Sequence, residues 1–122
     1  KERGSITESD FTGLTCDRYL YRAIGARRGE ANTLASMSRL ALREGRDDDA
    51  RALLQQAVSL HQAIGDRYSV AADLGNFGLV LRDIGRPEEA RPYLLQAAEL
   101  FDAIGLTERA ERHRRAAETI RE

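Results

Sequence analysis

The sequence predicts an all-α protein built as a right-handed α–α superhelix, a solenoid of about six antiparallel helices. The triplet Ala-Ile-Gly recurs at residues 23–25, 63–65 and 103–105, so the repeats stand forty residues apart. Residues 20–59 laid over residues 60–99 share 14 identities in 40 positions. A fixed period of this length is typical of repeat architectures, in which each supersecondary unit buries its apolar face against its neighbours. β-Branched residues are scarce, and no strand-like alternation of polar and apolar residues occurs.

Glycines at twenty-residue intervals predict where the helices end. Each of them follows a stretch with helical apolar spacing, as a left-handed C-cap glycine does. They are Gly25, Gly45, Gly65, Gly85 and Gly105. On this basis we expect six helices, at about 11–24, 28–44, 47–63, 67–84, 87–103 and 107–121.

The residues after these glycines predict where the next helices begin. Three successive aspartates at 47–49 complement the positive end of a helix dipole, and Pro87 suits a first helical position, where its missing N–H costs nothing. Pro92 lies inside the fifth expected helix and removes one backbone hydrogen bond, so we expect a bend in the first turn of that helix.

Matching apolar patterns recur in successive helices. The first-helix patterns are Leu34-x-x-Met37-Ser38-x-x-Ala41 and Leu74-x-x-Phe77-Gly78-x-x-Leu81, and the second-helix patterns are Ala50-x-x-x-Leu54-x-x-Ala57 and Ala90-x-x-x-Leu94-x-x-Ala97. The chain carrying them resembles the tetratricopeptide repeat family, in which small residues such as Gly78 and Ala90 let two helices approach closely. The resemblance covers residues 11–122. Extended forty-residue repeats of this kind are similar to those of kinesin light chains and of bacterial signalling and regulatory proteins.

We expect one helical repeat domain at residues 11–122, behind a flexible, polar N-terminal segment at residues 1–10. Because the sequence does not begin with Met, we expect the chain to be part of a longer protein.

The composition argues against nucleic-acid and membrane partners. Lys+Arg 19 and Asp+Glu 20 give a net charge of −1, without the basic excess with which proteins bind a nucleic-acid backbone. No apolar run approaches the roughly 18 residues that span a membrane. Cys16 is the only cysteine, which excludes an intrachain disulfide and favours a reducing compartment, so we expect a cytoplasmic protein.

The residues that could support catalysis or bind a metal are few and scattered. His61 and His113 have no ligand-type residue at metal-ligand spacing, and we expect both to pack at the edge of the core with the polar tip in water. Cys16 is expected to be an inert thiol, and the three aspartates lack the spacing of an EF-hand. We therefore predict a protein that is not an enzyme, with no catalytic residues, no metal site and no cofactor.

The last expected helix is dense in charges of both signs. Glu108 and Arg112, and likewise Glu111 and Arg115, stand four residues apart, a spacing at which opposite charges pair along a solvated helix. We expect both pairs to form, and we interpret this helix as the polar cap of the stack.

The resemblance also implies a binding surface. In tetratricopeptide-like stacks the first helix of each repeat lines the concave face, where ligands usually lie. Carried over residue by residue, the expected peptide-binding residues are Asn32, Arg39, Arg43, Leu79, Arg82, Arg112 and Arg115, over a small floor of Ala35, Ala72 and Gly75. An arginine cluster of this kind suits an extended acidic peptide or a carboxylate terminus. The asparagines with which chaperone-binding members clamp a carboxylate terminus are absent, because Arg39 and Leu79 stand at their positions.

Two functions remain open on this evidence. The first is a protein–protein or peptide-binding interaction module, a scaffold or sensor segment that binds an acidic or extended peptide. The alternative is a purely structural segment of a longer repeat protein, such as a bacterial signalling or transcriptional regulator, whose arginines only pair with local acidic residues. Asp10 and Asp17 stand where later repeats have alanines, which predicts a water-facing first helix and a monomer or weak dimer.

Overall fold

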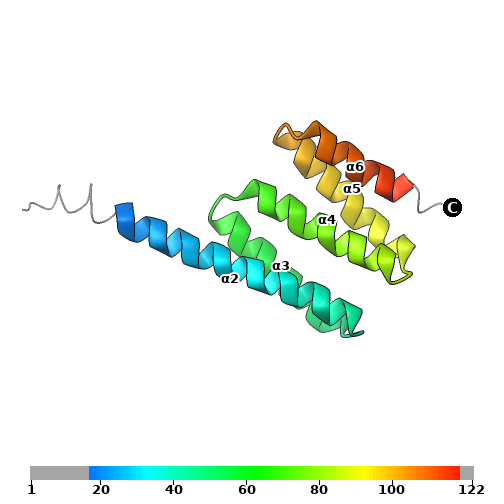
Figure 1. The fold of residues 1–122 in the computed structure, drawn as a ribbon, viewed down its shortest axis with the longest axis horizontal. Helices are drawn as coiled ribbons and strands as arrows, with labels where there is room; N and C mark the ends of the chain where they lie inside the picture. Colours follow the sequence, from blue (N-terminus) through cyan, green and yellow to red (C-terminus); the bar gives the residue numbers. More distant parts are fainter. Residues whose placement is uncertain (1–16, 119–122) are drawn as a thin grey trace, which may run out of the picture.

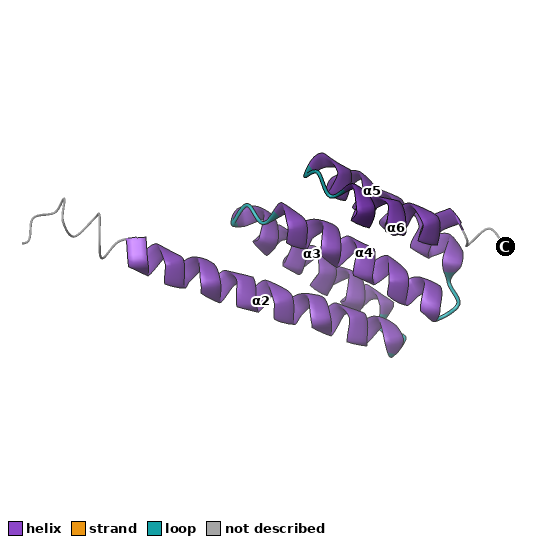
Figure 2. Cartoon of the chain, turned by 45° about the horizontal axis from the view of Figure 1, so that its top comes forward, coloured by secondary structure: helices purple, strands orange, loops and turns teal. Residues whose placement is uncertain are grey.

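The computed structural model describes residues 17–118, which form five α-helices and no strand (Figure 1). In chain order they are α2 (Asp17–Arg43), α3 (Asp47–Ala63), α4 (Arg67–Asp83), α5 (Pro87–Ala103) and α6 (Thr107–Glu118). Successive helices run antiparallel as stacked hairpins (Figure 2). The all-α solenoid fold is therefore confirmed. The segment at residues 1–10, and the first part of the helix expected at 11–24, lie outside the described residues.

Helix α4 lies at the centre of the stack. It packs against α5 in its own hairpin and against α3 and α2 of the preceding hairpin, while α6 packs against α5. Fully buried apolar side chains include Phe77, Leu81, Leu94 and Phe101, and the Phe77 ring lies 5.0 Å from that of Tyr93. Each hairpin thus buries its apolar face against its neighbours, as the forty-residue period predicts.

The helix ends confirm four of the five predicted glycine caps. Gly65 has a φ of +73°, its N–H donates to the carbonyl oxygen of Gln62 at 3.0 Å, and the N–H of Asp66 donates to that of His61 at 2.9 Å. This pair of bonds is a Schellman motif, which needs a left-handed residue that glycine adopts without strain. The same two bonds close the turns at Gly45, Gly85 and Gly105.

The prediction of a turn at Gly25 is wrong, because α2 runs unbroken from Asp17 to Arg43. The helices expected at 11–24 and 28–44 are therefore one helix within the described residues. The physical reason lies in the residues on the C-terminal side of each glycine. Asp66 caps α4 by accepting a hydrogen bond from the Ser69 N–H at 3.1 Å, and Pro87 begins α5. Gly25 is instead succeeded by Ala-Arg-Arg, good helix formers that offer neither a cap nor a proline.

The predicted close crossing of α4 and α5 is confirmed at Gly78. A Cβ added there would lie 3.0 Å from Cγ of Leu94 and 3.1 Å from Cβ of Tyr93, so a side chain has little room. The nearest neighbours are thus Leu94 and Tyr93, one turn beyond the expected Ala90. Pro92 lies inside α5, which continues through it without a break.

Candidate functional site

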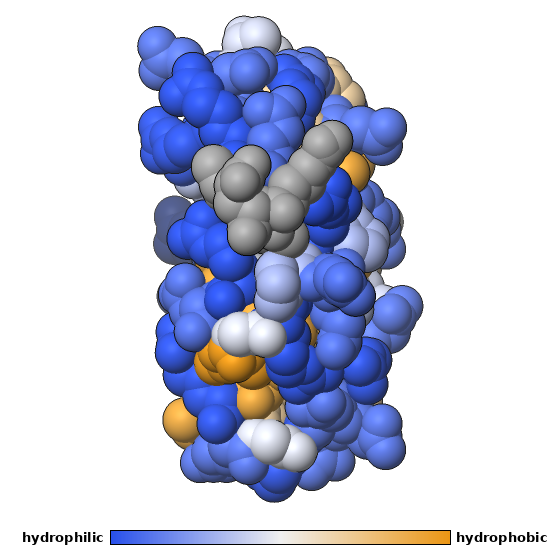
Figure 3. All heavy atoms as spheres, turned by 90° about the vertical axis from the view of Figure 1, so that its right-hand side faces the viewer, coloured by the Kyte–Doolittle hydropathy of each residue, from blue (hydrophilic) through white to orange (hydrophobic). Residues whose placement is uncertain are grey.

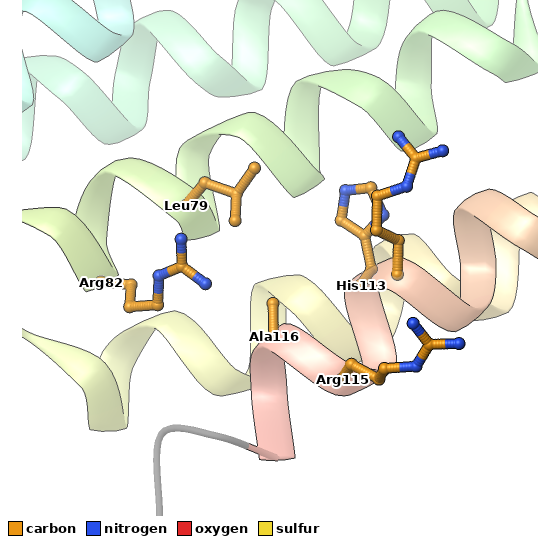
Figure 4. Close-up of a pocket in the computed structure, with 6 residues that line it drawn as sticks. Leu79, Arg82, His113, Arg115 and Ala116 are labelled. Carbon is orange, nitrogen blue, oxygen red and sulfur yellow. The ribbon is translucent and has the colours of Figure 1, made fainter.

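A hollow of about 370 Å³ lies between α4 and α6 (Figure 4). Leu79 and Arg82 stand three residues apart on α4, a spacing that places both on one face of the helix. His113, Ala116 and Arg115 on α6 lie across the hollow from them (Figure 4). The complete lining is Leu79, Arg82, Arg112, His113, Arg115 and Ala116.

The charge lining the hollow is positive, because the lining contains three arginines and no acidic residue. Arg112 and Arg115 are exposed, and neither forms an ion pair within residues 17–118. Arg82 makes one long contact, 3.7 Å from its Nη2 to Oδ1 of the neighbouring Asp83. The guanidinium groups are therefore open to an outside ligand.

The pairs expected along α6 do not form, which is what leaves these arginines free. Glu111 instead contacts Arg114, with Nη2 and Oε1 3.0 Å apart, and Arg114 also reaches Asp102 on α5 at 2.8 Å. Both carboxylates raise the pKa of Arg114 through hydrogen bonds, that of Asp102 first. Arg114 thus forms ion pairs both within α6 and across to α5, whereas Arg112 and Arg115 pair with neither Glu108 nor Glu111.

His113 is held in place rather than free. Its Nδ1 lies 2.8 Å from the carbonyl oxygen of Arg109, which can only accept, so Nδ1 carries a proton and donates. The ring lies 5.1 Å from that of Phe101, and a Cβ added at Gly75 would stand 2.5 Å from Nε2. The half-buried ring is thus a wall of the hollow at the edge of the core, as the sequence predicts.

The structure brings together four of the seven predicted site residues. Leu79, Arg82, Arg112 and Arg115 line the hollow, whereas Asn32, Arg39 and Arg43 lie on α2, outside that lining. Of the predicted floor, Ala35 and Gly75 are buried and Ala72 is half-buried. The end of the stack on the right of Figure 1 is mostly hydrophilic, with a small apolar area in its lower half (Figure 3).

The three residues on α2 differ in how far they are engaged. Arg39 makes a long hydrogen bond, 3.4 Å from Nη2 to Oγ of Ser36, and its charge also acts to lower the pKa of the buried Asp73. Arg43 is exposed without an ion pair among the described residues. The amide oxygen of Asn32 lies 3.1 Å from Nε2 of His61, so this side of the amide faces the interior of the stack.

The expectation that His61 has a wet polar tip is wrong. His61 is 0% exposed, and its Nδ1 lies 2.7 Å from Oδ2 of Asp73 on α4. One ring nitrogen faces the Asp73 carboxyl group and the other faces the Asn32 amide, so both have a polar partner although the ring is buried. Burial raises the pKa of the Asp73 carboxyl, and the hydrogen bond to His61 opposes that rise. The available signal was spacing, since His61 follows Ala57 by four residues on the buried stripe of α3.

Residues 17–118 contain no group of three or more His, Cys, Asp or Glu side chains arranged to hold a metal ion. None of the described helices is both long enough and apolar enough to cross a membrane.

The comparison with known proteins agrees with the geometry. A profile of the tetratricopeptide repeat family matches residues 29–103, more than half of the chain. No curated protein and no solved structure shows a significant match. The matched region includes the complete hairpins α4–α5 and α3 with the C-terminal half of α2. The chain belongs to the tetratricopeptide repeat family.

Proposed function

We propose that this chain binds an extended acidic peptide of a protein partner, in the hollow between α4 and α6. Tetratricopeptide repeats are protein–protein interaction modules, typically without catalytic activity, so a protein partner is expected from the family. The finer proposal of an acidic peptide in this hollow rests on the arginines, and the proposed cytoplasmic location rests on the single cysteine.

The observation that supports it best is that Arg82, Arg112 and Arg115 line one hollow that has no acidic lining residue. A carboxylate ligand bound there neutralises part of this positive charge. Each charge-assisted hydrogen bond to such a ligand contributes about 1.5–3 kcal/mol before ordering costs. Leu79 and Ala116 supply an apolar surface against which an aliphatic side chain of the peptide can pack.

The binding surface extends beyond the hollow along the first helices of the repeats. Arg39 and Arg43 on α2 continue the positive charge past α4, which contacts both α2 and α5. With helix spacings of roughly 8–10 Å, three helices span about 20 Å, or about six residues of extended peptide. A peptide of that length with carboxylates at alternate positions presents them on one side, as the arginines require.

The experiment is a titration followed by fluorescence anisotropy, with a labelled eight-residue peptide in which glutamate alternates with leucine. We expect micromolar binding that weakens as the salt concentration rises. The double variant Arg82→Glu with Arg115→Glu should weaken binding about tenfold or more while the helical circular dichroism signal is unchanged.

The matched control is Arg18→Glu with Arg67→Glu, which makes the same charge change at two exposed arginines that do not line the hollow. It should leave binding within about twofold of the unmodified chain, because screening at physiological salt limits the reach of exposed charges. Equal losses in both double variants would mean that net charge alone attracts the peptide. No salt-sensitive binding at all would favour a purely structural segment of a longer repeat protein.

A further inference from the structure

The N-terminal part of α2 extends past the other helices (left in Figure 1) and exposes apolar side chains. Tyr19 is 71% exposed there. Further along the same helix, Met37 is 46% exposed and Leu40 is 55% exposed. Large exposed apolar side chains grouped on one element are typical of interaction surfaces.

The repeat shows that this face is one that a neighbouring helix normally covers. Met37 and Leu40 stand forty residues before Phe77 and Val80, which are 1% and 5% exposed on α4. Each helix has its own hairpin partner, α3 for α2 and α5 for α4. Helix α4 also contacts α2 and α3, whereas α2 has no preceding hairpin among the described residues. Phe77 is also covered by Tyr93 of its own hairpin, so the difference in exposure between Leu40 and Val80 is the one that marks the side of α2 that a preceding helix would cover.

Three of the exposed apolar residues lie on one face of α2, whereas the exposed Leu20, Tyr21 and Ile24 lie on other sides of the helix. At about 100° per residue, Tyr19, Met37 and Leu40 fall within a sector of about 80°. Ala26 and Thr33 occupy the middle of this sector, and two residues of opposite charge, Arg22 and Glu30, lie at its two edges. All of these residues are exposed, and neither Arg22 nor Glu30 forms an ion pair within residues 17–118.

We propose that α2 pairs antiparallel with α2 of a second copy of this chain through this face. Because α2 runs straight through Gly25, no helix among the described residues folds back over the face that carries Met37 and Leu40. The face is also complementary to itself. A two-fold axis at Ala26, midway between Arg22 and Glu30, places Arg22 of each copy opposite Glu30 of the other.

The same axis matches the apolar and small residues. Tyr19 falls opposite Thr33 of the second copy and beside its Met37, so the exposed aromatic ring covers the exposed thioether. Ala26 meets its own counterpart at the crossing, where a small side chain permits the 8–10 Å approach of packed helices. The pairing lies on α2, away from the lining of the α4–α6 hollow, so the dimer does not depend on the proposed peptide binding.

Sedimentation velocity of the full chain over a range of concentrations tests the pairing. We expect a concentration-dependent shift from monomer to dimer, and a dissociation constant at least tenfold higher for Met37→Glu. Leu95→Glu is the matched control, because Leu95 is a 42% exposed leucine on α5. It should leave dimerisation unchanged. A chain that stays monomeric at its highest soluble concentration would overturn the proposal.

Charge reversal tests the antiparallel register. Arg22→Glu and Glu30→Arg should each weaken the dimer, since each places like charges opposite one another twice. The double variant restores both pairs and should return the dissociation constant to within about threefold of the unmodified value. Dimerisation that survives Met37→Glu, or single variants that are not rescued by the double variant, would place the contact elsewhere and contradict the proposed axis.

Discussion

His61 on α3 and Asp73 on α4 form a buried pair, with Nδ1 and Oδ2 2.7 Å apart, that joins one hairpin to the next. One repeat further along, Phe101 and His113 occupy the same two positions and meet through their rings, 5.1 Å apart. The polar pair therefore belongs to one specific junction of the stack. Because the described residues contain this pair at a single junction, the pair helps to determine which hairpin stacks on which.

Removing one partner of this pair should be costly. His61→Phe leaves the Asp73 carboxyl buried without its partner, and breaking a buried pair in this way destabilises a protein by about 3–5 kcal/mol. The double variant His61→Phe with Asp73→His recreates the Phe101–His113 combination, so its free energy of unfolding should fall much less than that of the single variant. Urea unfolding followed by circular dichroism measures both. Equal losses in the single and double variants would mean that the cost comes from altered packing alone.

The close crossing of α4 and α5 predicts a large effect of Gly78→Leu. The added side chain must displace Leu94 and Tyr93, and overpacking of this kind typically costs about 1–3 kcal/mol. Because a short solenoid depends on contacts between nearest neighbours, the loss should appear in the whole transition. A melting temperature within a degree or two of the unmodified chain would contradict the crossing.

Gly25→Ala provides the opposite expectation and tests the continuous α2. Gly25 lies inside the helix, and an added Cβ meets nothing within 4 Å, so alanine should favour the helix by about 1 kcal/mol. Thermal melting followed by circular dichroism should show increased helical signal or a higher midpoint. If the chain turned at Gly25 with a left-handed backbone, alanine would instead be unfavourable and the helical signal would fall.

The ion pairs of Arg86 with two carboxylates predict how the stability of the fold depends on pH. It contacts Asp47 at the start of α3 at 2.8 Å and Glu89 on α5 at 2.6 Å, and the hydrogen bonds from Arg86 lower the pKa of both carboxyls. A carboxyl with a lowered pKa in the folded state stabilises the fold above its unfolded pKa of about 4. That contribution is lost as the pH falls through the folded-state pKa.

The variant Arg86→Gln should therefore narrow the difference in melting temperature between pH 6 and pH 2. Arg67→Gln removes an exposed arginine that has no ion pair within residues 17–118, and it should leave the difference unchanged. An unchanged pH dependence in the Arg86 variant would show that the two carboxylates are not paired in solution.

The spacing of the glycines predicted the turns of the hairpins. It failed at Gly25, where the residues after the glycine favour a continued helix. The turns at Gly45, Gly65, Gly85 and Gly105 formed because each glycine is succeeded by residues that start a new helix. Gly25 shares the Ala-Ile-Gly triplet, but nothing after it stops the helix, so periodicity alone was insufficient. The sequence does not reveal the His61–Asp73 pair, because the two residues lie on different helices, twelve residues apart, and meet only when the hairpins stack.

The candidate site was predictable as far as it depends on the repeat register. Leu79, Arg82, Arg112 and Arg115 come together because equivalent positions on α4 and α6 face the same side of the stack. Which acidic residue each arginine pairs with depends on the distance between helices, which a sequence does not contain. Arg114 thus forms ion pairs with Glu111 and Asp102, and Arg115 forms none within residues 17–118.

The most direct test of the proposed function is to map the peptide's contacts by two-dimensional ¹H–¹⁵N NMR. Titration with the acidic peptide should shift the amide resonances of Leu79, Arg82 and the α6 residues from Arg112 to Ala116, and leave those of α3 in place. Shifts confined to the opposite groove, which Gln55, Val58 and Gln96 line between α3 and α5, would contradict the account.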